Sequence, residues 1–184
     1  MKVVLASGSP RRRELLSTIV PEFEVLVVEV DEEGLTLADP FETAERLAEA
    51  KAKAVAPLRP EALVIGGDTV VALDGEQFAK PKDAADARRM LRALSGQTHV
   101  VATGISLVTP KAVQTFHDKT YVTFRELTDE EIAGYVATGE PMDKAGGYAI
   151  QGGAASFVVR REGSESNVIG LPLEALSIAL EALG

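Results

Sequence analysis

Cysteine is absent from this 184-residue chain, and so is tryptophan. Without cysteine, the chain can form no disulfide, no thiolate metal site and no cysteine nucleophile. Histidine occurs only twice, as His99 and His117, which argues against a metal site built from several histidines. A catalytic metal would therefore need oxygen ligands, and such ligands favour a hard divalent cation, Mg²⁺ or Mn²⁺.

Long apolar runs and an excess of positive charge are missing as well. No run approaches the roughly 18 apolar residues that span a bilayer, and the apolar segment within residues 2–13 is too short for a secretory signal and is followed by three arginines. We therefore expect a cytoplasmic protein without a membrane partner. Its 28 acidic and 19 basic residues give a formal charge of −9. That balance disfavours nucleic-acid binding, but a small anion could still bind where basic residues gather.

The hydrophobic pattern predicts a mixture of strands and helices. Four of the expected helices begin at capping residues, Ser9, Asp39, Asp83 and Thr128, and Asp74-Gly75 predicts a hairpin turn. We expect strands at 2–6, 23–30, 62–73, 98–108, 112–124 and 148–161, and helices at 10–19, 40–56, 84–94, 129–139 and 172–183. The two types do not alternate strictly, so the fold class is α/β or α+β around a mixed sheet. No linker or repeat is evident, and we expect one domain over residues 1–184.

The first chemical signal is the segment Ser7-Gly8-Ser9-Pro10 with the three arginines at 11–13, between a strand and a helix. Arginines in a first helical turn oppose the helix dipole unless an anion lies nearby. Backbone N–H groups at a helix start, serine hydroxyls and guanidinium groups all suit phosphate oxygens. The candidate anion-binding groups are the backbone N–H groups of the helix start, the hydroxyls of Ser7 and Ser9, and the three arginines 11–13. The alternative is a solvated helix start with no ligand.

The second signal is Gly66-Gly67-Asp68-Thr69, within an apolar run. Burying an unpaired carboxylate is costly, so a metal or a lysine beside Asp68 is expected. The glycines allow a ligand to approach the backbone closely. The alternative is a turn beside a bulge. A second carboxylate could come from residues 31–33, although an exposed acidic turn is an equal alternative.

Two lysine pairs and a glycine-rich segment are the remaining chemical signals. Lys80 or Lys82 could neutralise phosphate charge, and the alternative is a basic turn before a helix cap. Lys51 and Lys53 lie near the C-terminus of a helix, where compensation of the helix dipole is an equal alternative to a functional role. The backbone of residues 143–153 could lie against a flat ligand, and the Gln151 amide could form hydrogen bonds with the edge of a base. Taken alone, that segment is better explained as a structural glycine loop. It matches neither a Walker loop nor a dinucleotide fingerprint, and a Ser-His-Asp triad fits badly because no nucleophile elbow is present.

Together these motifs closely resemble the Maf family across essentially the whole chain. The motifs that carry the resemblance are SGSPRRRELL (7–16), VDE (30–32), GGDTVV (66–71), KPKD (80–83), SGQTH (95–99), DKAGGYAIQGGA (143–154) and NVIGLPL (167–173). The resemblance implies a nucleoside triphosphate pyrophosphatase with an elongated fold like that of the inosine triphosphate pyrophosphatases. In that fold a central mixed sheet is flanked by helices, and two lobes surround a cleft. It also implies a divalent metal and, commonly, a homodimer.

Three positions resemble the branch of the family that acts on dTTP and UTP. That branch has arginine, threonine and glutamine where this chain has Arg11, Thr69 and Gln151, and the branch acting on 7-methyl-GTP differs there. The resemblance thus implies conversion of dTTP or UTP to the monophosphate and pyrophosphate. Modified pyrimidine nucleotides stay open as substrates. A nucleotide-binding regulator of septum formation that needs no turnover is the alternative function.

The resemblance assigns the catalytic role to Asp68, and the roles of the other candidate residues are our hypothesis. Asp68 would be the catalytic acid-base group, directing a metal-activated water at the α-phosphorus. Glu32 would hold the metal together with Asp68, with Asp31 and Glu33 as alternatives to Glu32. The residues that would bind the phosphates are Ser7, Ser9, Arg11, Arg12, Lys51 and Lys80, and those that would select a pyrimidine are Thr69 and Gln151.

Overall fold

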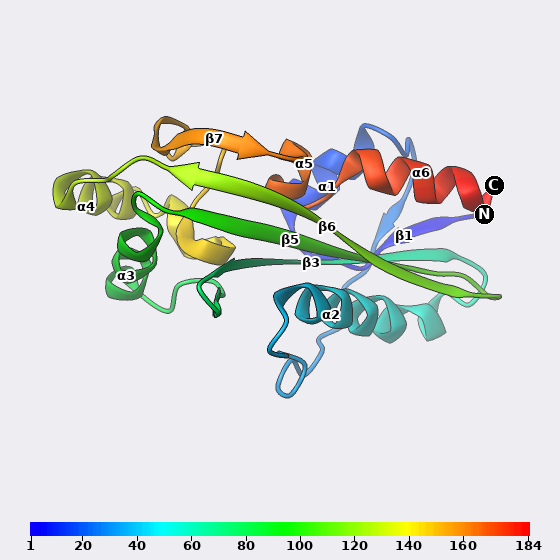
Figure 1. Ribbon diagram of the computed structural model, residues 1–184. Coiled ribbons are helices and arrows are strands. Elements are labelled where there is room, and N and C mark those ends of the chain that lie inside the picture. The colour runs from blue at the N-terminus through cyan, green and yellow to red at the C-terminus, as the bar shows by residue number, and fades with distance from the viewer. The chain divides into compact units, whose positions relative to one another are not determined.

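The computed structural model describes all residues, 1–184, and contains a seven-stranded sheet with six α-helices (Figure 1). The strands are β1 (Val3–Leu5), β2 (Glu24–Val25), β3 (Leu63–Leu73), β4 (Glu76–Phe78), β5 (Thr98–Val108), β6 (Val113–Phe124) and β7 (Val158–Glu162). The helices are α1 (Pro10–Ser17), α2 (Pro40–Val55), α3 (Ala84–Leu94), α4 (Asp129–Ala137), α5 (Glu165–Ile169) and α6 (Leu173–Leu183). Short 3₁₀ turns are η1 (Ala56–Leu58), η2 (Glu140–Asp143), η3 (Ala145–Gly147) and η4 (Ala155–Phe157). No helix has the length and apolar character needed to cross a membrane.

The sheet is mixed, as the sequence predicts. Its strand order is β2-β1-β3-β5-β6-β7, and β4 pairs with β3 outside that path. Strand β1 runs parallel to both β2 and β3, whereas β4 is antiparallel to β3 and β7 is antiparallel to β6. The predicted class, a mixed sheet with helices around it, is therefore confirmed.

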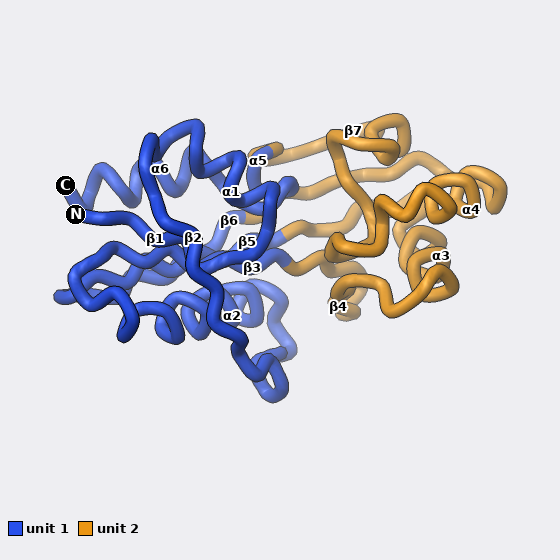
Figure 2. The backbone as a smooth tube through the Cα atoms, turned by 180° about the vertical axis from the view of Figure 1, so that it is seen from behind, with its two compact units in different colours: residues 1–69, 102–118, 166–184 blue, residues 70–101, 119–165 orange.

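The chain divides into two compact units, coloured separately in Figure 2. Unit 1 consists of residues 1–69, 102–118 and 166–184, and unit 2 of residues 70–101 and 119–165. The long strands β3, β5 and β6 contribute residues to both units. The prediction of one domain stays a prediction.

Unit 1 has two apolar layers because its strands alternate their side chains between the two faces of the sheet. Leu5 and Ile65 pack in a cluster with residues of α1 and α6, and all these core side chains are buried. Their neighbours Val4 and Val64 pack in a second cluster with residues of α2. Helices α1 and α6 therefore cover one face and α2 the other (Figure 1).

Helix α2 approaches its face of the sheet unusually closely, at two glycines. A Cβ atom on Gly66 of β3 would lie 2.2 Å from the carbonyl oxygen of Ala48, and one on Gly104 of β5 would lie 2.2 Å from that of Ala44. Any side chain at either position would therefore clash with helix backbone. This close packing lets an α2 side chain, that of Lys51, reach the Asp68 carboxylate on β3.

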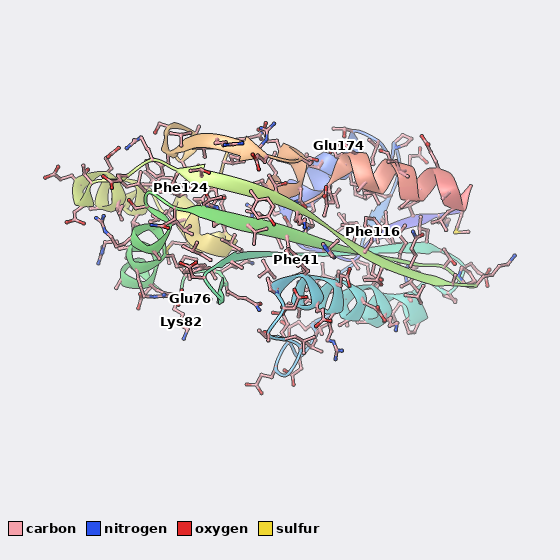
Figure 3. The ribbon with its side chains drawn as sticks, viewed as in Figure 1. Phe41, Glu76, Lys82, Phe116, Phe124 and Glu174 are labelled. Atoms are coloured by element: carbon pink, nitrogen blue, oxygen red, sulfur yellow. The ribbon has the colours of Figure 1, made fainter.

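Unit 2 packs around an aromatic cluster that includes a buried histidine. The ring of Phe124, labelled on β6 in Figure 3, contacts the rings of His99 and Tyr148 edge-on. His99 is only 1% exposed, and its Nε2 lies 2.6 Å from the Tyr148 hydroxyl oxygen. Its other ring nitrogen, Nδ1, makes no hydrogen bond with the protein. Burial lowers the pKa of His99 from 6.5 to about 4.

This shift predicts a loss of stability in mild acid. The unfolded chain binds a proton at His99 as the pH falls through 6.5, whereas the folded chain resists doing so until about pH 4, so stability falls across that window. At about 1.4 kcal/mol per pH unit, we expect His99 to cost about 2 kcal/mol between pH 7 and pH 5. Urea unfolding of the native chain and of His99→Gln at both pH values measures the contribution of His99 to this loss of stability. An equal loss in the two proteins would contradict the assignment.

Most of the predicted local signals are present. The side chains of Ser9, Asp39, Asp83 and Thr128 each accept a hydrogen bond from the first turn of their helix. Asp74 and Gly75, both with positive φ, form the turn between β3 and β4. These features were predictable because each depends on residues only a few positions apart.

The strand predicted at 23–30 is wrong beyond its first residues. Only Glu24 and Val25 pair with β1, although the Leu26 amide also donates to the Leu5 carbonyl oxygen, at 3.1 Å. The pairing stops because β1 itself ends at Leu5, where the chain turns toward α1. An apolar segment cannot extend as a strand past the end of its partner.

The strand predicted at 148–161 is also largely wrong. Residues 148–157 form turns and η4, and only Val158–Glu162 pairs as β7. The Gly153 amide instead donates to the Glu140 carboxylate, at 3.0 Å. A Cβ on Gly152 would lie 2.1 Å from a Glu140 oxygen, so these glycines fit a close turn around Glu140. Residues 165–169, which lie outside every expected helix and strand, form the short helix α5.

Candidate functional site

The loop between β1 and α1 presents a helix start without acidic residues. The Ser9 hydroxyl accepts from the Arg12 amide at 3.3 Å, and the Ser7 hydroxyl accepts from the Ser9 amide at 3.2 Å. Each hydroxyl acts as an acceptor in these bonds and keeps one hydrogen that it can donate to an anion. Because the first turn of α1 has no carboxylate, its positive end is not neutralised from within the helix.

The Arg12 guanidinium is fixed by three neutral acceptors. Its Nε donates to the Gly170 carbonyl oxygen at 2.7 Å, Nη2 to the Thr69 hydroxyl at 2.8 Å, and Nη1 to the Ser7 hydroxyl at 3.3 Å. Guanidinium carries five N–H donors, so two remain to bind oxygens of an anion. Burial lowers the pKa of Arg12, an effect that the Asp68 charge opposes. A half-buried cation held by neutral partners has its charge available for a ligand.

Two residues that support Arg12, Thr103 and Gly170, were not predicted as functional. The Thr69 hydroxyl is 2.9 Å from that of Thr103, a fully buried residue of β5, and Thr103 in turn donates to the Asn167 carbonyl oxygen at 2.9 Å. The other is Gly170, whose φ of 136° suits glycine. The signals that could have indicated them are the polar Thr103-Gly104 pair inside an apolar strand and the position of Gly170 within the motif NVIGLPL (167–173).

Strand β3 carries two clusters on opposite faces at residues 66–69. A Cβ on Gly66 would meet α2, whereas a Cβ on Gly67 would lie 3.1 Å from Arg12 Nε. Because side chains alternate along a strand, Asp68 lies on the α2 face and Thr69 on the Arg12 face. The contacts agree, since Asp68 bonds to α2 and Thr69 to Arg12.

On the α2 face, two carboxylates meet one ammonium group. Lys51 Nζ lies 2.6 Å from Asp68 Oδ1 and 3.3 Å from Glu32 Oε1. The Asp68 side chain is 15% exposed and that of Glu32 is 55% exposed, so Asp68 is the shielded member. Lys51 thus supplies the lysine partner expected for Asp68. Lys53, two residues later, pairs with Glu49 instead.

The acidic segment 31–33 contributes Glu32 to this cluster. Asp31 Oδ1 accepts from the Glu33 amide at 3.0 Å, which is a local turn contact. Glu32 is the residue that reaches Lys51, so it is the better candidate for the second carboxylate.

The donor chemistry of Asp68 and Glu32 fits a hard divalent cation. Both are oxygen ligands, and they already converge on a single positive charge, that of Lys51. Mg²⁺ is commonly held by one or two carboxylates, with water and substrate oxygens as its other ligands. No group of three or more histidine, aspartate or glutamate side chains is placed to hold a metal ion. These two residues could therefore supply only part of a coordination shell.

Two of the predicted residues lie in unit 2. Lys80 is an exposed residue after β4, and nearby Lys82, labelled in Figure 3, is also exposed, with its amide donating to Asp86 at 3.0 Å. Gln151 is exposed in the segment after η3, and its amide nitrogen donates to Glu165 Oε1 at 3.0 Å. The predicted residues of unit 1 form the two clusters around Arg12 and Lys51, with Arg11 beside Arg12 on α1.

Comparison with known proteins gives near-full-length matches. Residues 2–183 match the family described as Maf-like protein. A dTTP/UTP pyrophosphatase of Bacillus cytotoxicus is 49% identical over 175 residues, covering 95% of this chain and 92% of that protein. Proteins of the same name from Citrifermentans bemidjiense and Pelotomaculum thermopropionicum are each 48% identical, covering 99% and 100% of this chain and 95% and 97% of their own lengths.

Two solved structures of a similar fold are those of Ham1 proteins. That of Staphylococcus aureus aligns with a TM-score of 0.59 at 19% identity and covers all of both chains. That of Coxiella burnetii aligns with a TM-score of 0.53 at 16% identity and covers 99% of both. At these identities the likeness concerns the fold alone.

Proposed function

Because this chain belongs to the Maf family, we propose that it hydrolyses dTTP and UTP to the corresponding monophosphate and pyrophosphate. The observation that carries the proposal is its 48–49% identity, over nearly its full length, to relatives named for that activity. The three residues that mark this branch, Arg11, Thr69 and Gln151, are all present. Turnover, rather than regulation of septum formation by binding alone, is the function these relatives support.

The triphosphate is held by the start of α1 and by lysines. Ser7 and Ser9 donate their hydroxyl hydrogens to phosphate oxygens, beside the backbone amides of the helix N-terminus. Arg12 supplies its two remaining N–H groups, and its fixed geometry reduces the entropy lost on binding. Arg11, Lys51 and Lys80 neutralise further negative charge. Phosphoryl transfer depends mainly on such positioning and charge stabilisation.

Asp68 orients the attacking water and accepts its proton. The water oxygen forms a bond to the α-phosphorus while the bond from that phosphorus to the bridging oxygen of the β-phosphate breaks, and pyrophosphate leaves. Lys51 holds the Asp68 carboxylate through a 2.6 Å contact and keeps it directed toward the site. A partly shielded carboxylate with a fixed orientation suits general-base catalysis.

A divalent cation, Mg²⁺ or Mn²⁺, is proposed as the cofactor, held by Asp68 and Glu32. When bound, such a cation neutralises phosphate charge and makes a coordinated water more acidic. The convergence of both carboxylates on the Lys51 charge supports this choice of residues.

Gln151 is proposed to contact the pyrimidine base, and Thr69 to act through Arg12. The Thr69 hydroxyl already accepts from Arg12 and lies within hydrogen-bond distance of Thr103. Its effect on substrate choice would then come from the position of Arg12. A cytoplasmic location and a homodimer, both expected above, stay predictions.

A substrate panel tests the activity. We expect incubation with Mg²⁺ and dTTP or UTP to release monophosphate and pyrophosphate in equal amounts, with much lower rates for GTP and 7-methyl-GTP. Product analysis by chromatography with phosphate detection separates pyrophosphate from orthophosphate. Binding of dTTP or UTP without turnover would contradict the proposal and favour the regulator, and release of orthophosphate alone would indicate a different bond cleaved.

A further inference from the structure

Gln151 is held by a carboxylate that is itself fixed from its other side. Glu165 Oε1 accepts from the Gln151 amide nitrogen at 3.0 Å, while Oε2 accepts from Arg161 Nη1 at 2.8 Å. Arg161 also donates from Nε to the Gly163 carbonyl oxygen at 3.1 Å. All four residues belong to unit 2. Glu165 therefore joins the glycine-rich segment to the end of β7.

The chemistry of a carboxylate sets the orientation of the Gln151 amide. An ionised carboxylate only accepts hydrogen bonds, whereas a glutamine amide has a donor end and an acceptor end. Gln151 must therefore turn its nitrogen toward Glu165. Its carbonyl oxygen then points away from Glu165, where it is available to a ligand.

This orientation matters because uracil and cytosine present opposite patterns. Uracil and thymine have a donor at N3 beside an acceptor at O4, whereas cytosine has an acceptor at N3 beside the donor N4 amino group. An amide that rotates by 180° can match either base. An amide fixed in one orientation matches only one of them.

We propose that Glu165, held by Arg161, is a positioning residue that fixes the Gln151 amide to accept from N3–H of uracil or thymine and so discriminates against cytosine. The inference rests on the proposed function, in which Gln151 contacts the base. Neither Glu165 nor Arg161 was among the residues that the sequence singled out. Glu165 is the first residue of α5.

Glu165→Gln tests the proposal with a nearly isosteric change. A glutamine at 165 can donate or accept, so both orientations of the Gln151 amide become possible. We expect the ratio of kcat/KM for UTP to kcat/KM for CTP to fall about three- to tenfold, the effect of one hydrogen bond between exposed groups. The CTP value should rise while the UTP value falls. Equal changes for both substrates would show a merely structural role and overturn the inference.

Two further variants isolate the effect. Glu162→Gln removes the same charge from β7, where Glu162 pairs with Arg160, and should leave the ratio as in the native chain. In a Gln151→Ala background, Glu165→Gln should not change the ratio further, because the amide it orients is gone. An undiminished effect of Glu165→Gln in that background would also overturn the inference.

Product binding separates this inference from the proposed activity. Titration calorimetry with UMP and with CMP requires no turnover, so it applies even if no triphosphate is hydrolysed. We expect the preference for UMP over CMP to fall by a similar factor in Glu165→Gln. An absence of hydrolysis with this shift would contradict only the proposed function. An unchanged preference in a variant with native unfolding behaviour would contradict only the role of Glu165.

Discussion

Replacement of Asp68 by asparagine is expected to lower kcat for dTTP and UTP by roughly 10²–10⁴-fold, the usual contribution of a general base. Asparagine keeps the size of the side chain and one oxygen but cannot accept a proton from water. It also removes the charge that faces Lys51 Nζ at 2.6 Å. Steady-state kinetics with pyrophosphate detection measures kcat and KM separately, and the loss should lie mainly in kcat.

Asp74→Asn is the matched control. It makes the same chemical change in the exposed turn between β3 and β4, where φ is 49° and asparagine is well tolerated. We expect its kcat to stay within about twofold of the native value, as for a surface substitution. Normal pyrophosphate release by Asp68→Asn would refute the assignment of Asp68 as the base.

Local signals in the sequence predict the helices and turns because their causes are short in range. Helix α3 spans Ala84–Leu94 as expected, since Asp83 caps it and its apolar residues face one side. The prediction of a strand at 23–30 is wrong because its cause is long in range. Its extent depends on where β1 ends, and nothing within residues 23–30 records that.

In the candidate site, too, short-range features were predictable and long-range contacts were not. Asp68 and Arg12 were evident as charges in unfavourable places, one in an apolar run and one at the wrong end of a helix. For Asp68 a lysine partner could be expected, although not which lysine it is. For Arg12 the partner was not evident, because the Gly170 oxygen that receives Arg12 Nε lies 158 residues along the chain.

Lys51 and Lys53 illustrate what a local explanation misses. Compensation of the helix dipole applied to both residues equally. Residues two apart on a helix point to different sides, however. Lys51 reaches Asp68 of β3, while Lys53 stays on the surface of α2 with Glu49. The distinction depends on the close packing of α2 over Gly66, a tertiary feature.

Arg12→Lys is expected to lower kcat/KM for dTTP and UTP by about 10²-fold although it keeps the positive charge. A lysine ammonium has three donors at one atom and cannot reach Gly170, Thr69 and Ser7 together as the planar guanidinium does. A phosphate oxygen would then compete with these acceptors for the same donors. Loss of one preorganised donor to transition-state charge typically costs about 10²–10³-fold.

Arg13 is the exposed neighbour of Arg12 on α1. The variant Arg13→Lys therefore controls for a general effect of lysine in this helix, and it should retain nearly native kcat/KM.

Arg12→Lys should also unfold at lower urea concentration, because a buried acceptor left without its donor costs about 1–3 kcal/mol. Thr103→Val removes the hydroxyl next to that of Thr69. It should weaken the hydrogen bonds around Arg12 without changing the charge of the arginine. If Arg12→Lys and Arg13→Lys were equally active, the fixed geometry of Arg12 would be irrelevant to the reaction, and charge alone would explain the three arginines of the helix start.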